Sequence, residues 1–319
     1  MHTGQDFFYL PDDVLDGMRI APAEIADEIE RALVAKSEGR LHTAPKSAIM
    51  PGDGRYMMST MAVGDDGLTV VKQVSVSPEN PARGLPAING AIMVLDAETG
   101  LLRALLGANW ITAHRTAALS AVAARKLADP ASETIAFVGC GVQADSHLQA
   151  FRDMFPLSRV LAVGRGAKNV QRFCASARDL GYEAIAAEPK DALRQADIVV
   201  TSITLDYTVK PFLDARWLKP NAFAAITDLF IPWDDTAIDI FGMVVVDDLE
   251  QERAMDKPMV PAQAISGDLA DLVMGALPAR SLDAPAAFAF RGIALGDYAA
   301  SALALRHAEA SGAGEKIAP

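Results

Sequence analysis

Residues 135–144, Ile-Ala-Phe-Val-Gly-Cys-Gly-Val-Gln-Ala, join an apolar, strand-like run to a glycine turn and a helix-compatible segment. In such a G-x-G-x-x-A sequence Gly139 allows a tight turn, and Gly141 lets a pyrophosphate approach the backbone. The small Ala144 lets the helix pack on the strand, and the positive end of the helix attracts phosphates. A plain strand–turn–helix is the alternative, but the context on both sides favours a nucleotide site. Its predicted cofactor-binding residues are Gly139, Gly141, Val142, Gln143 and Ala144.

Length and composition limit the partners of this chain. Its 319 residues suffice for two domains, and 51% hydrophobic with 22% charged residues is ordinary globular composition. The net charge of -12 argues against nucleic acid or an anionic membrane as a partner, but permits a local cationic pocket. Two cysteines, Cys140 and Cys174, are too few for a disulfide framework or a tetrahedral metal site. The histidines have no metal-ligand spacing, so no metal site is predicted.

Residues 1–35 do not resemble a signal peptide, because acidic residues interrupt every apolar stretch. The longest apolar runs have the length of strands and are too short to cross a membrane. We therefore expect a soluble, cytoplasmic protein.

The first third of the sequence predicts one helix and a mostly antiparallel sheet. Apolar residues follow helical spacing from 22 to 38. Strand-like segments, separated by Gly, Pro and Asp clusters, are predicted at 47–50, 55–61, 68–76 and 90–96. A hairpin-type turn then leads to a returning strand at 101–106.

From residue 112 onward the pattern changes. An Ala-rich helix is predicted over 112–127, with Thr112 as its N-cap. Apolar strands then alternate with helical segments, which is typical of a parallel, doubly wound sheet. These strands are predicted at 134–139, 159–163, 183–187, 197–202, 222–227 and 243–247. A last Ala-rich helix at 292–309 is expected to return to the first domain.

Several motifs together resemble the ornithine cyclodeaminase/mu-crystallin family. They are Asn-Trp-Ile-Thr-Ala-His-Arg-Thr-Ala-Ala at 109–118, Gly-Cys-Gly-Val-Gln-Ala at 139–144, and Val-Val-Asp-Asp-Leu-Glu-Gln at 245–251. Gly292-Ile293-Ala294 with Asp297 resembles the last motif of that family. The resemblance extends from about residue 20 to about residue 305, and the combination of motifs is specific.

The resemblance implies an α/β fold: a Rossmann doubly wound parallel sheet inserted into a smaller α+β domain for substrate binding and dimerisation. The expected boundaries are 1–118 for the substrate-binding and dimerisation domain, 119–291 for the Rossmann dinucleotide-binding domain, and 292–319 for a C-terminal helix returning to the first domain. Family members use NAD or NADP and transfer hydride at a carbon that bears an amino or imino nitrogen. The implied partners are a small amino or imino acid and a second copy of the chain.

A reductase of an α-imino acid must hold the substrate carboxylate. Arg115, in the family's substrate motif, fits this need because a guanidinium binds a carboxylate in a bidentate fork. Lys72, at the family's lysine position, is predicted to bind the carboxylate or donate a proton. Lys46 stands where the family usually has arginine, and Arg83 lies in a loop that could add a cation. For Arg115, Lys72 and Arg83 a solvated position without a role is the alternative.

The proton donor is predicted among Asp228, His114 and Lys72. Family cyclodeaminases carry an aspartate in a Gly-Gly-Asp-Cys-Pro-Gly run after the strand that faces nicotinamide, and Asp228 is its counterpart. Apolar residues at 229–231 replace the small ones here, which weakens the case for ornithine cyclisation; a capping role for Asp228 is the alternative. His114 is a candidate proton donor or substrate contact, with packing as the alternative.

The residues at the end of the second Rossmann strand help to determine whether the cofactor is NAD or NADP. NAD-preferring sheets usually carry an acid there for the ribose 2′-OH, but residues 163–166 are Val-Gly-Arg-Gly. Arg165 could meet a 2′-phosphate, so NAD and NADP both stay open. The other predicted cofactor-binding residues are Thr112, Thr201, Ser202, Asp228 and Gly292.

The sequence therefore predicts an NAD(P)H-dependent reductase of a small α-imino acid that runs reversibly as an amino acid dehydrogenase. Lys46, Arg83 and His114 offer more cations than one carboxylate requires, which favours iminosuccinate as substrate and L-aspartate as product. The first alternative is ornithine cyclodeaminase, which converts L-ornithine to L-proline and ammonia. The second is a non-enzymatic dinucleotide-binding protein of mu-crystallin type.

Overall fold

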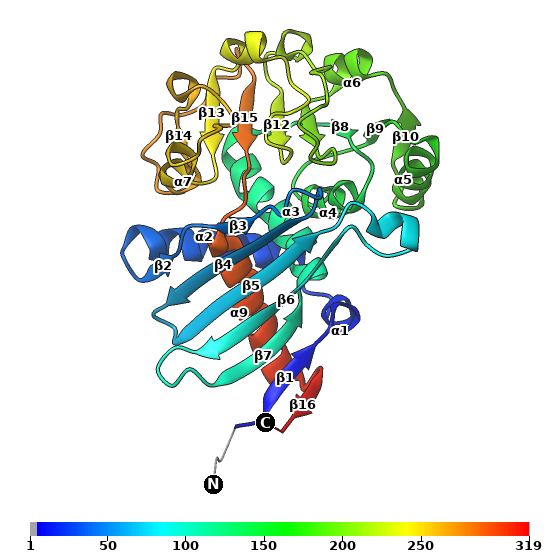
Figure 1. Cartoon of the computed structure of the whole chain (residues 1–319). Helices are drawn as coiled ribbons and strands as arrows, with labels where there is room; N and C mark the ends of the chain where they lie inside the picture. Colours follow the sequence, from blue (N-terminus) through cyan, green and yellow to red (C-terminus); the bar gives the residue numbers. More distant parts are fainter. Residues whose placement is uncertain (1–4, 319) are drawn as a thin grey trace. The chain divides into compact units, whose positions relative to one another are not determined.

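The computed structural model describes residues 5–318, which fall into two units (Figure 1). The first unit combines the N-terminal part, up to Arg115, with the C-terminal part from Ile293 onward. The second unit is the continuous segment Thr116–Gly292. In sequence, the second unit is thus an insertion into the first. No helix among the described residues is long and apolar enough to span a membrane.

The first unit contains a mixed sheet. Its strands are β1 (Phe7–Leu10), β2 (Leu41–Thr43), β3 (Ser47–Ile49), β4 (Tyr56–Gly64), β5 (Leu68–Val76), β6 (Ile88–Asp96), β7 (Leu102–Gly107) and β16 (Glu315–Ile317). The order is β16-β1-β7-β6-β5-β4-β2, with β3 also paired to β4. β1 runs parallel to β7, and the other pairs are antiparallel.

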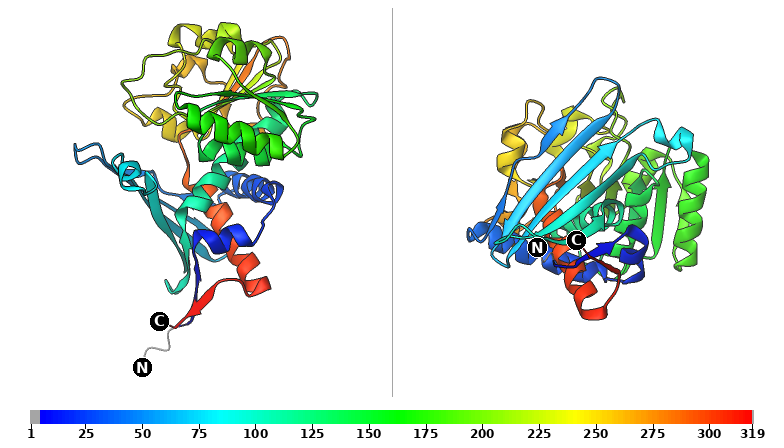
Figure 2. Two further views of the ribbon diagram at one scale, coloured as in Figure 1. Left: turned by 90° about the vertical axis from the view of Figure 1, so that its right-hand side faces the viewer. Right: turned by 60° about the horizontal axis from the view of Figure 1, so that its bottom comes forward.

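Two long helices cover one face of this sheet. They are α2 (Pro22–Ser37) and α9 (Ala294–Ser311); the short α1 (Asp12–Gly17) and a 3-10 helix, η1 (Asn80–Arg83), complete the unit. α9 packs against α2 and against β4, β5 and β6, and Figure 2 shows both helices on the same side of the sheet. α9 is buried from Ala294 to Leu305, where the sequence is rich in alanine and mostly apolar.

Helix α3 (Ala108–Leu127) begins earlier than the sequence predicts. Thr112 was predicted as its N-cap, but the helix starts directly after β7 and Thr112 lies inside it, so that prediction is wrong. The reason is a tertiary contact: the Asp12 carboxylate accepts a hydrogen bond from the backbone N–H of Trp110 at 2.8 Å. An acid far away in the sequence thus accepts a hydrogen bond from one of the free N–H groups in the first turn of the helix.

The second unit is built on an all-parallel sheet. Its strands are β8 (Thr134–Val138), β9 (Arg159–Val163), β10 (Glu183–Ala186), β11 (Ile198–Thr201), β12 (Phe223–Ile226), β13 (Met243–Val246), β14 (Gly267–Asp268) and β15 (Ala286–Ala289). The order is β10-β9-β8-β11-β12-β15-β13-β14, and every pairing is parallel. The predicted fold class, a Rossmann-type parallel sheet with a second mixed domain, is confirmed.

Helices lie on both faces of this sheet. They are α4 (Val142–Phe151), α5 (Ala167–Asp179), α6 (Pro189–Gln195), α7 (Leu249–Arg253) and α8 (Leu269–Val273), with 3-10 helices η2 (Ala215–Trp217), η3 (Asp235–Ile240) and η4 (Ala262–Ala264). Phe137 of β8 stacks edge-on against Phe173 of α5, whereas Val138 packs with Leu193 of α6. Because successive strand residues point to opposite faces, α5 and α6 cover opposite faces.

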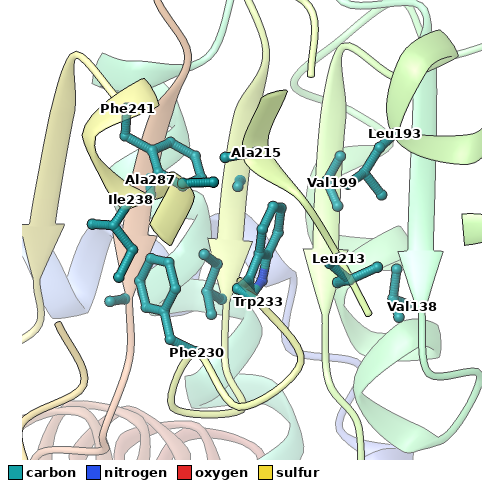
Figure 3. Packing of buried hydrophobic residues seen from close by; sticks show 14 of the residues in the cluster. Val138, Leu193, Val199, Leu213, Ala215, Phe230, Trp233, Ile238, Phe241 and Ala287 are labelled. Carbon is teal, nitrogen blue, oxygen red and sulfur yellow. The ribbon is translucent and has the colours of Figure 1, made fainter. Parts of the chain in front are cut away.

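The α6 side of the sheet carries a large apolar cluster (Figure 3). Phe230, Trp233 and Phe241 form its aromatic part, with ring centroids 5.7 to 6.2 Å apart. Phe230 and Trp233 belong to the segment that follows β12, so the core of this unit anchors the loop in which Asp228 lies.

Candidate active site

The glycine turn of the second unit has the geometry that the sequence predicts. Gly139 has φ of +102°, and a Cβ there would lie 2.6 Å from the carbonyl oxygen of Ser202, so only glycine fits. Gly141 differs, because a Cβ added to it would meet nothing within 4 Å. The protein's own packing does not require glycine at this position. The open space lies at the start of α4, where a phosphate group can approach the backbone.

The start of α4 has no side-chain cap. Gly141 is the N-cap and offers no side chain, and Val142 at the first helical position is 68% exposed. The N–H groups of Val142 and Gln143 precede the first intrahelical hydrogen bond, while Ala144 is fully buried and lets the helix approach the strand. The donor set and the open space therefore fit the pyrophosphate of a dinucleotide.

Asp228 lies just after β12 and is fully buried. Its Oδ1 accepts a hydrogen bond from the Thr201 hydroxyl at 2.9 Å, and its Oδ2 accepts one from the backbone N–H of Ile203 at 3.1 Å. Burial raises the pKa of Asp228 to about 7, although both hydrogen bonds act in the opposite direction. The carboxyl therefore exchanges its proton near neutral pH, but both oxygens are engaged within the second unit.

The two residues after Asp228 have an uncommon backbone conformation. Leu229 and Phe230 have φ of 59° and 60°, the left-handed region that bulky residues rarely adopt. Such strain persists only where the surroundings impose it, and it clusters at functional sites. The Phe230 ring packs against the rings of both Trp233 and Phe241, and this packing holds the segment in place (Figure 3).

The other predicted cofactor-binding residues of the second unit lie at or just after the ends of its strands. The Ser202 hydroxyl donates to the Gly139 carbonyl at 3.4 Å, and Thr201 is fully buried at the end of β11. Arg165 is exposed in the loop between β9 and α5. Gly292 donates its N–H to Asp247 Oδ2 at 2.6 Å; the sequence analysis gave Asp247 no role beyond its motif.

The first unit contains a buried cluster of Lys72, Asp297 and Arg115. Lys72 Nζ lies 2.6 Å from Asp297 Oδ1, and Arg115 Nε lies 3.0 Å from the same oxygen. Thr60, directly opposite Lys72 in the sheet, donates its hydroxyl to Asp297 Oδ2 at 2.9 Å. The exposed fractions of Lys72, Arg115 and Asp297 are 1%, 4% and 1%. Buried charges of this kind are tolerated only when paired and hydrogen-bonded.

Burial and mutual attraction set the ionisation of this cluster. Burial lowers the pKa of Lys72 to about 8; Asp297 opposes this shift and Arg115 adds to it. For Asp297, burial raises the pKa, but Lys72 and Arg115 together outweigh burial and the net pKa is lowered. Asp297 is therefore ionised at neutral pH. The Lys72 ammonium releases its proton near pH 8, only slightly above neutral pH. The sequence analysis names Asp297 only as part of a motif and does not identify it as the counter-ion of Lys72 and Arg115.

The other predicted substrate residues are more dispersed. Lys46 lies close enough to Lys72 for its charge to lower the pKa of Lys72 further. Arg83 is exposed at the end of η1. His114 Nδ1 donates to the Trp110 carbonyl at 2.9 Å, the two rings stack, and burial lowers the pKa of His114, so this histidine is neutral at pH 7. Thr112 lies half-buried on the same helix.

Comparisons with known proteins show which family and which solved structures this chain resembles. The model of the ornithine cyclodeaminase/mu-crystallin family matches residues 9–311. Alanine dehydrogenase of Archaeoglobus fulgidus is 27% identical over 93% of this chain and 94% of its own length. Δ1-Pyrroline-2-carboxylate reductase of Thermococcus litoralis, solved with NADH and L-proline, is 24% identical with a TM-score of 0.89, covering 98% of this chain and 100% of that one. An archaeal alanine dehydrogenase dimer with bound NAD is 24% identical with a TM-score of 0.88, covering 98% and 99%.

Proposed function

Because the chain belongs to the ornithine cyclodeaminase/mu-crystallin family, we propose that it is an NAD(P)H-dependent reductase of a small α-imino acid that works reversibly as an amino acid dehydrogenase. The observation that carries this proposal is the buried Lys72–Asp297–Arg115 cluster. Two cations in a desolvated setting suit the carboxylate that every α-imino acid carries. The similarity to alanine dehydrogenase over 93% of the chain supports the same class of reaction.

Each residue of the cluster has a distinct proposed role. Arg115 binds the substrate α-carboxylate, since its guanidinium is planar and always charged. Lys72, whose pKa is about 8, keeps the imine nitrogen protonated or returns a proton to it, and Asp297 orients both cations. A bound nicotinamide cofactor supplies the hydride in reduction and accepts it in the reverse reaction. Val142 and Gln143 are proposed to bind its pyrophosphate through their backbone N–H groups.

Within this class we propose iminosuccinate as the substrate and L-aspartate as the product. Lys46 supports this substrate, because it lies close enough for its charge to lower the pKa of Lys72 and can pair with a second substrate carboxylate. Neutral His114 and exposed Arg83 add little to it. Asp228 favours a reductase over a cyclodeaminase: both carboxylate oxygens already accept hydrogen bonds, leaving neither dedicated to a second substrate amine.

The test is an absorbance assay of NADH and NADPH oxidation with α-keto acids plus ammonia and with cyclic imines. We expect stoichiometric cofactor oxidation, fastest with oxaloacetate and ammonia, which form iminosuccinate. Faster turnover of pyruvate or of a cyclic imine would overturn the dicarboxylate assignment but keep the reductase. Conversion of L-ornithine to L-proline without net cofactor change would replace the reductase by a cyclodeaminase. Inert protein across the whole screen would contradict both.

Arg115→Met tests the carboxylate site directly. Loss of a buried charge contact should lower kcat/KM, mostly by raising KM, and the loss should correspond to about 2–5 kcal/mol of activation free energy. The affinity for the nucleotide should stay at the wild-type value. The matched control is Arg194→Met, which removes an exposed arginine of α6 and should leave both quantities unchanged. Near-normal kinetics in Arg115→Met would remove the proposed role of Arg115.

We also propose a homodimer formed through the open face of the mixed sheet. Met61, Val71, Met93, Leu105 and Tyr9 are register neighbours across β4, β5, β6, β7 and β1. They alternate with buried residues that face α9, so this apolar row lies on the opposite face. Met61 and Met93 are 48% and 42% exposed in the single chain. The dimeric state of the archaeal alanine dehydrogenase supports a second copy as the occupant.

A further inference from the structure

The loop after β9 is where a Rossmann sheet distinguishes between the two nicotinamide dinucleotides. An acid there binds the ribose 2′-OH of NAD, whereas an arginine accommodates the 2′-phosphate of NADP. β9 ends at Val163 and α5 begins at Ala167, so the loop consists of Gly164, Arg165 and Gly166. Arg165 is therefore the only residue of this three-residue loop that has a side chain. A Cβ at Gly166 would meet nothing within 4 Å, so there is open space beside Arg165.

The first turn of α5 extends this cationic environment. Gly166 is the N-cap and provides no side-chain cap, and no acid occupies the first turn. Lys168 lies in that turn and is exposed. The α2, α6, α7 and α8 helices, in contrast, each carry an acid in the first turn. The positive end of α5 is therefore reinforced by two cations, and the first turn of this helix contains no carboxylate that would oppose it.

Arg172 shows which way this face of α5 points. Its Nη2 donates to the Cys140 carbonyl of the glycine turn at 3.0 Å, and its guanidinium binds Asp145 through two bonds of 3.1 and 2.8 Å. Lys168 is four residues earlier on the helix and so shares this face. Lys168 thus lies on the side of α5 that faces the glycine turn. Asp145 balances the charge of Arg172, which leaves Arg165 and Lys168 as the candidate phosphate ligands.

One acid lies near Arg165. The pKa of Asp206 is lowered chiefly by hydrogen bonds from Thr208 and, to a smaller extent, by the charge of Arg165. The Asp206 carboxylate accepts from the Thr208 N–H at 2.9 Å and the Thr208 hydroxyl at 2.6 Å. Within residues 5–318 Arg165 forms no ion pair with it. The guanidinium therefore stays available for an exchangeable anion.

We propose that the chain prefers NADP(H) to NAD(H), and that Arg165 and Lys168 bind the 2′-phosphate at the start of α5. This inference rests on the proposed function, because it assumes that a nicotinamide dinucleotide binds to the glycine turn. It separates the chain from the two solved relatives above, which contain NADH and NAD.

The experiment is a fluorescence titration of the whole protein with NADPH and NADH, followed through the 3 tryptophans. We expect NADPH to bind at least about tenfold more tightly, with a preference that weakens as salt is added. Arg165→Met should remove most of the preference by weakening NADPH while leaving NADH nearly unchanged. Lys168→Met should remove a smaller part. The control, Arg194→Met, should retain the full preference.

The outcomes separate this inference from the proposed function. Equal or tighter binding of NADH by the wild type overturns the NADP(H) preference and leaves the reductase intact. A preference for NADPH that survives in Arg165→Met overturns the assignment of Arg165. Failure of both nucleotides to bind overturns the proposed function itself. Because Arg165 is an exposed loop residue, Arg165→Met should fold, and unchanged NADH affinity in that variant verifies it.

Discussion

Lys72, Arg115 and Asp297 come from β5, α3 and α9, and they meet because the first unit packs α9 against β5. The family resemblance identifies Lys72 and Arg115 as candidate site residues, and their roles stay predictions. Physical reasoning also demands a counter-ion for a buried lysine. Nothing local says which of 41 acids supplies it, because that depends on how a helix near the C-terminus packs against strands near the N-terminus.

At the same scale, Asp228 predicts a specific pH dependence. Its pKa is about 7 in the folded chain and about 3.8 in the unfolded one, so the folded state binds more protons between these values. The contribution of Asp228 to stability therefore falls as the pH rises from about 4 to about 7. Asp228→Asn cannot ionise and should be free of this loss. Relative to wild type, it should gain about 2–3 kcal/mol of unfolding free energy between pH 5 and pH 7.5.

Urea unfolding at the two pH values measures this difference. Asp239→Asn, which changes an exposed aspartate, is the control and should keep the wild-type pH dependence. If Asp228→Asn parallels the wild type at both pH values, the buried carboxyl does not titrate in this range.

At the scale of elements, local patterning predicted most strands and the long helices, and it failed where tertiary contacts decide. β15, Ala286–Ala289, was not predicted because three of its four residues are alanine, which has a weak preference for strands. It is nevertheless fully buried between β12 and β13, where small side chains fit. The start of α3 was predicted four residues late, because the Asp12 contact lies outside any local window.

That contact gives a prediction for the element itself. Asp12→Ala removes the acceptor for the Trp110 N–H and should lower the unfolding free energy by about 1 kcal/mol, as loss of a helix cap usually does. Asp13→Ala, an exposed position on the same short helix, is the matched control and should cost less. Thermal and urea unfolding provide the measurement. Equal effects of the two substitutions would mean that Asp12 acts through α1 and not through α3.

At the scale of the whole molecule, the sequence predicted the inserted architecture through its motifs. The predicted boundaries were 118/119 and 291/292, and the structure divides the chain after Arg115 and after Gly292. Alternating strands and helices are enough to predict a parallel sheet, whereas the return of the last helix to the first domain is suggested by its position and implied by the family resemblance. Hydrophobic periodicity contains no information about which distant segments pair.

The proposed homodimer gives the prediction at this scale. Met61→Glu with Met93→Glu would place two charges in the apolar row and should shift the protein from dimer to monomer. Light scattering coupled to size-exclusion chromatography measures the mass. Leu282→Glu, at an exposed position of the second unit, is the control and should remain dimeric. A wild type that is monomeric at every concentration, or a double variant that stays dimeric, would reject this face as the interface.

The division of the first unit between the two ends of the chain has a consequence for biosynthesis. Domains usually fold in the order in which the ribosome releases them. Here the strand bearing Lys72 is translated before the inserted segment Thr116–Gly292, whereas its ion partner Asp297 and the covering helix α9 are translated after it. While the inserted segment is being translated, the strands of the first unit should therefore lack their covering helix, and Lys72 should lack its counter-ion, so that chaperones can bind them.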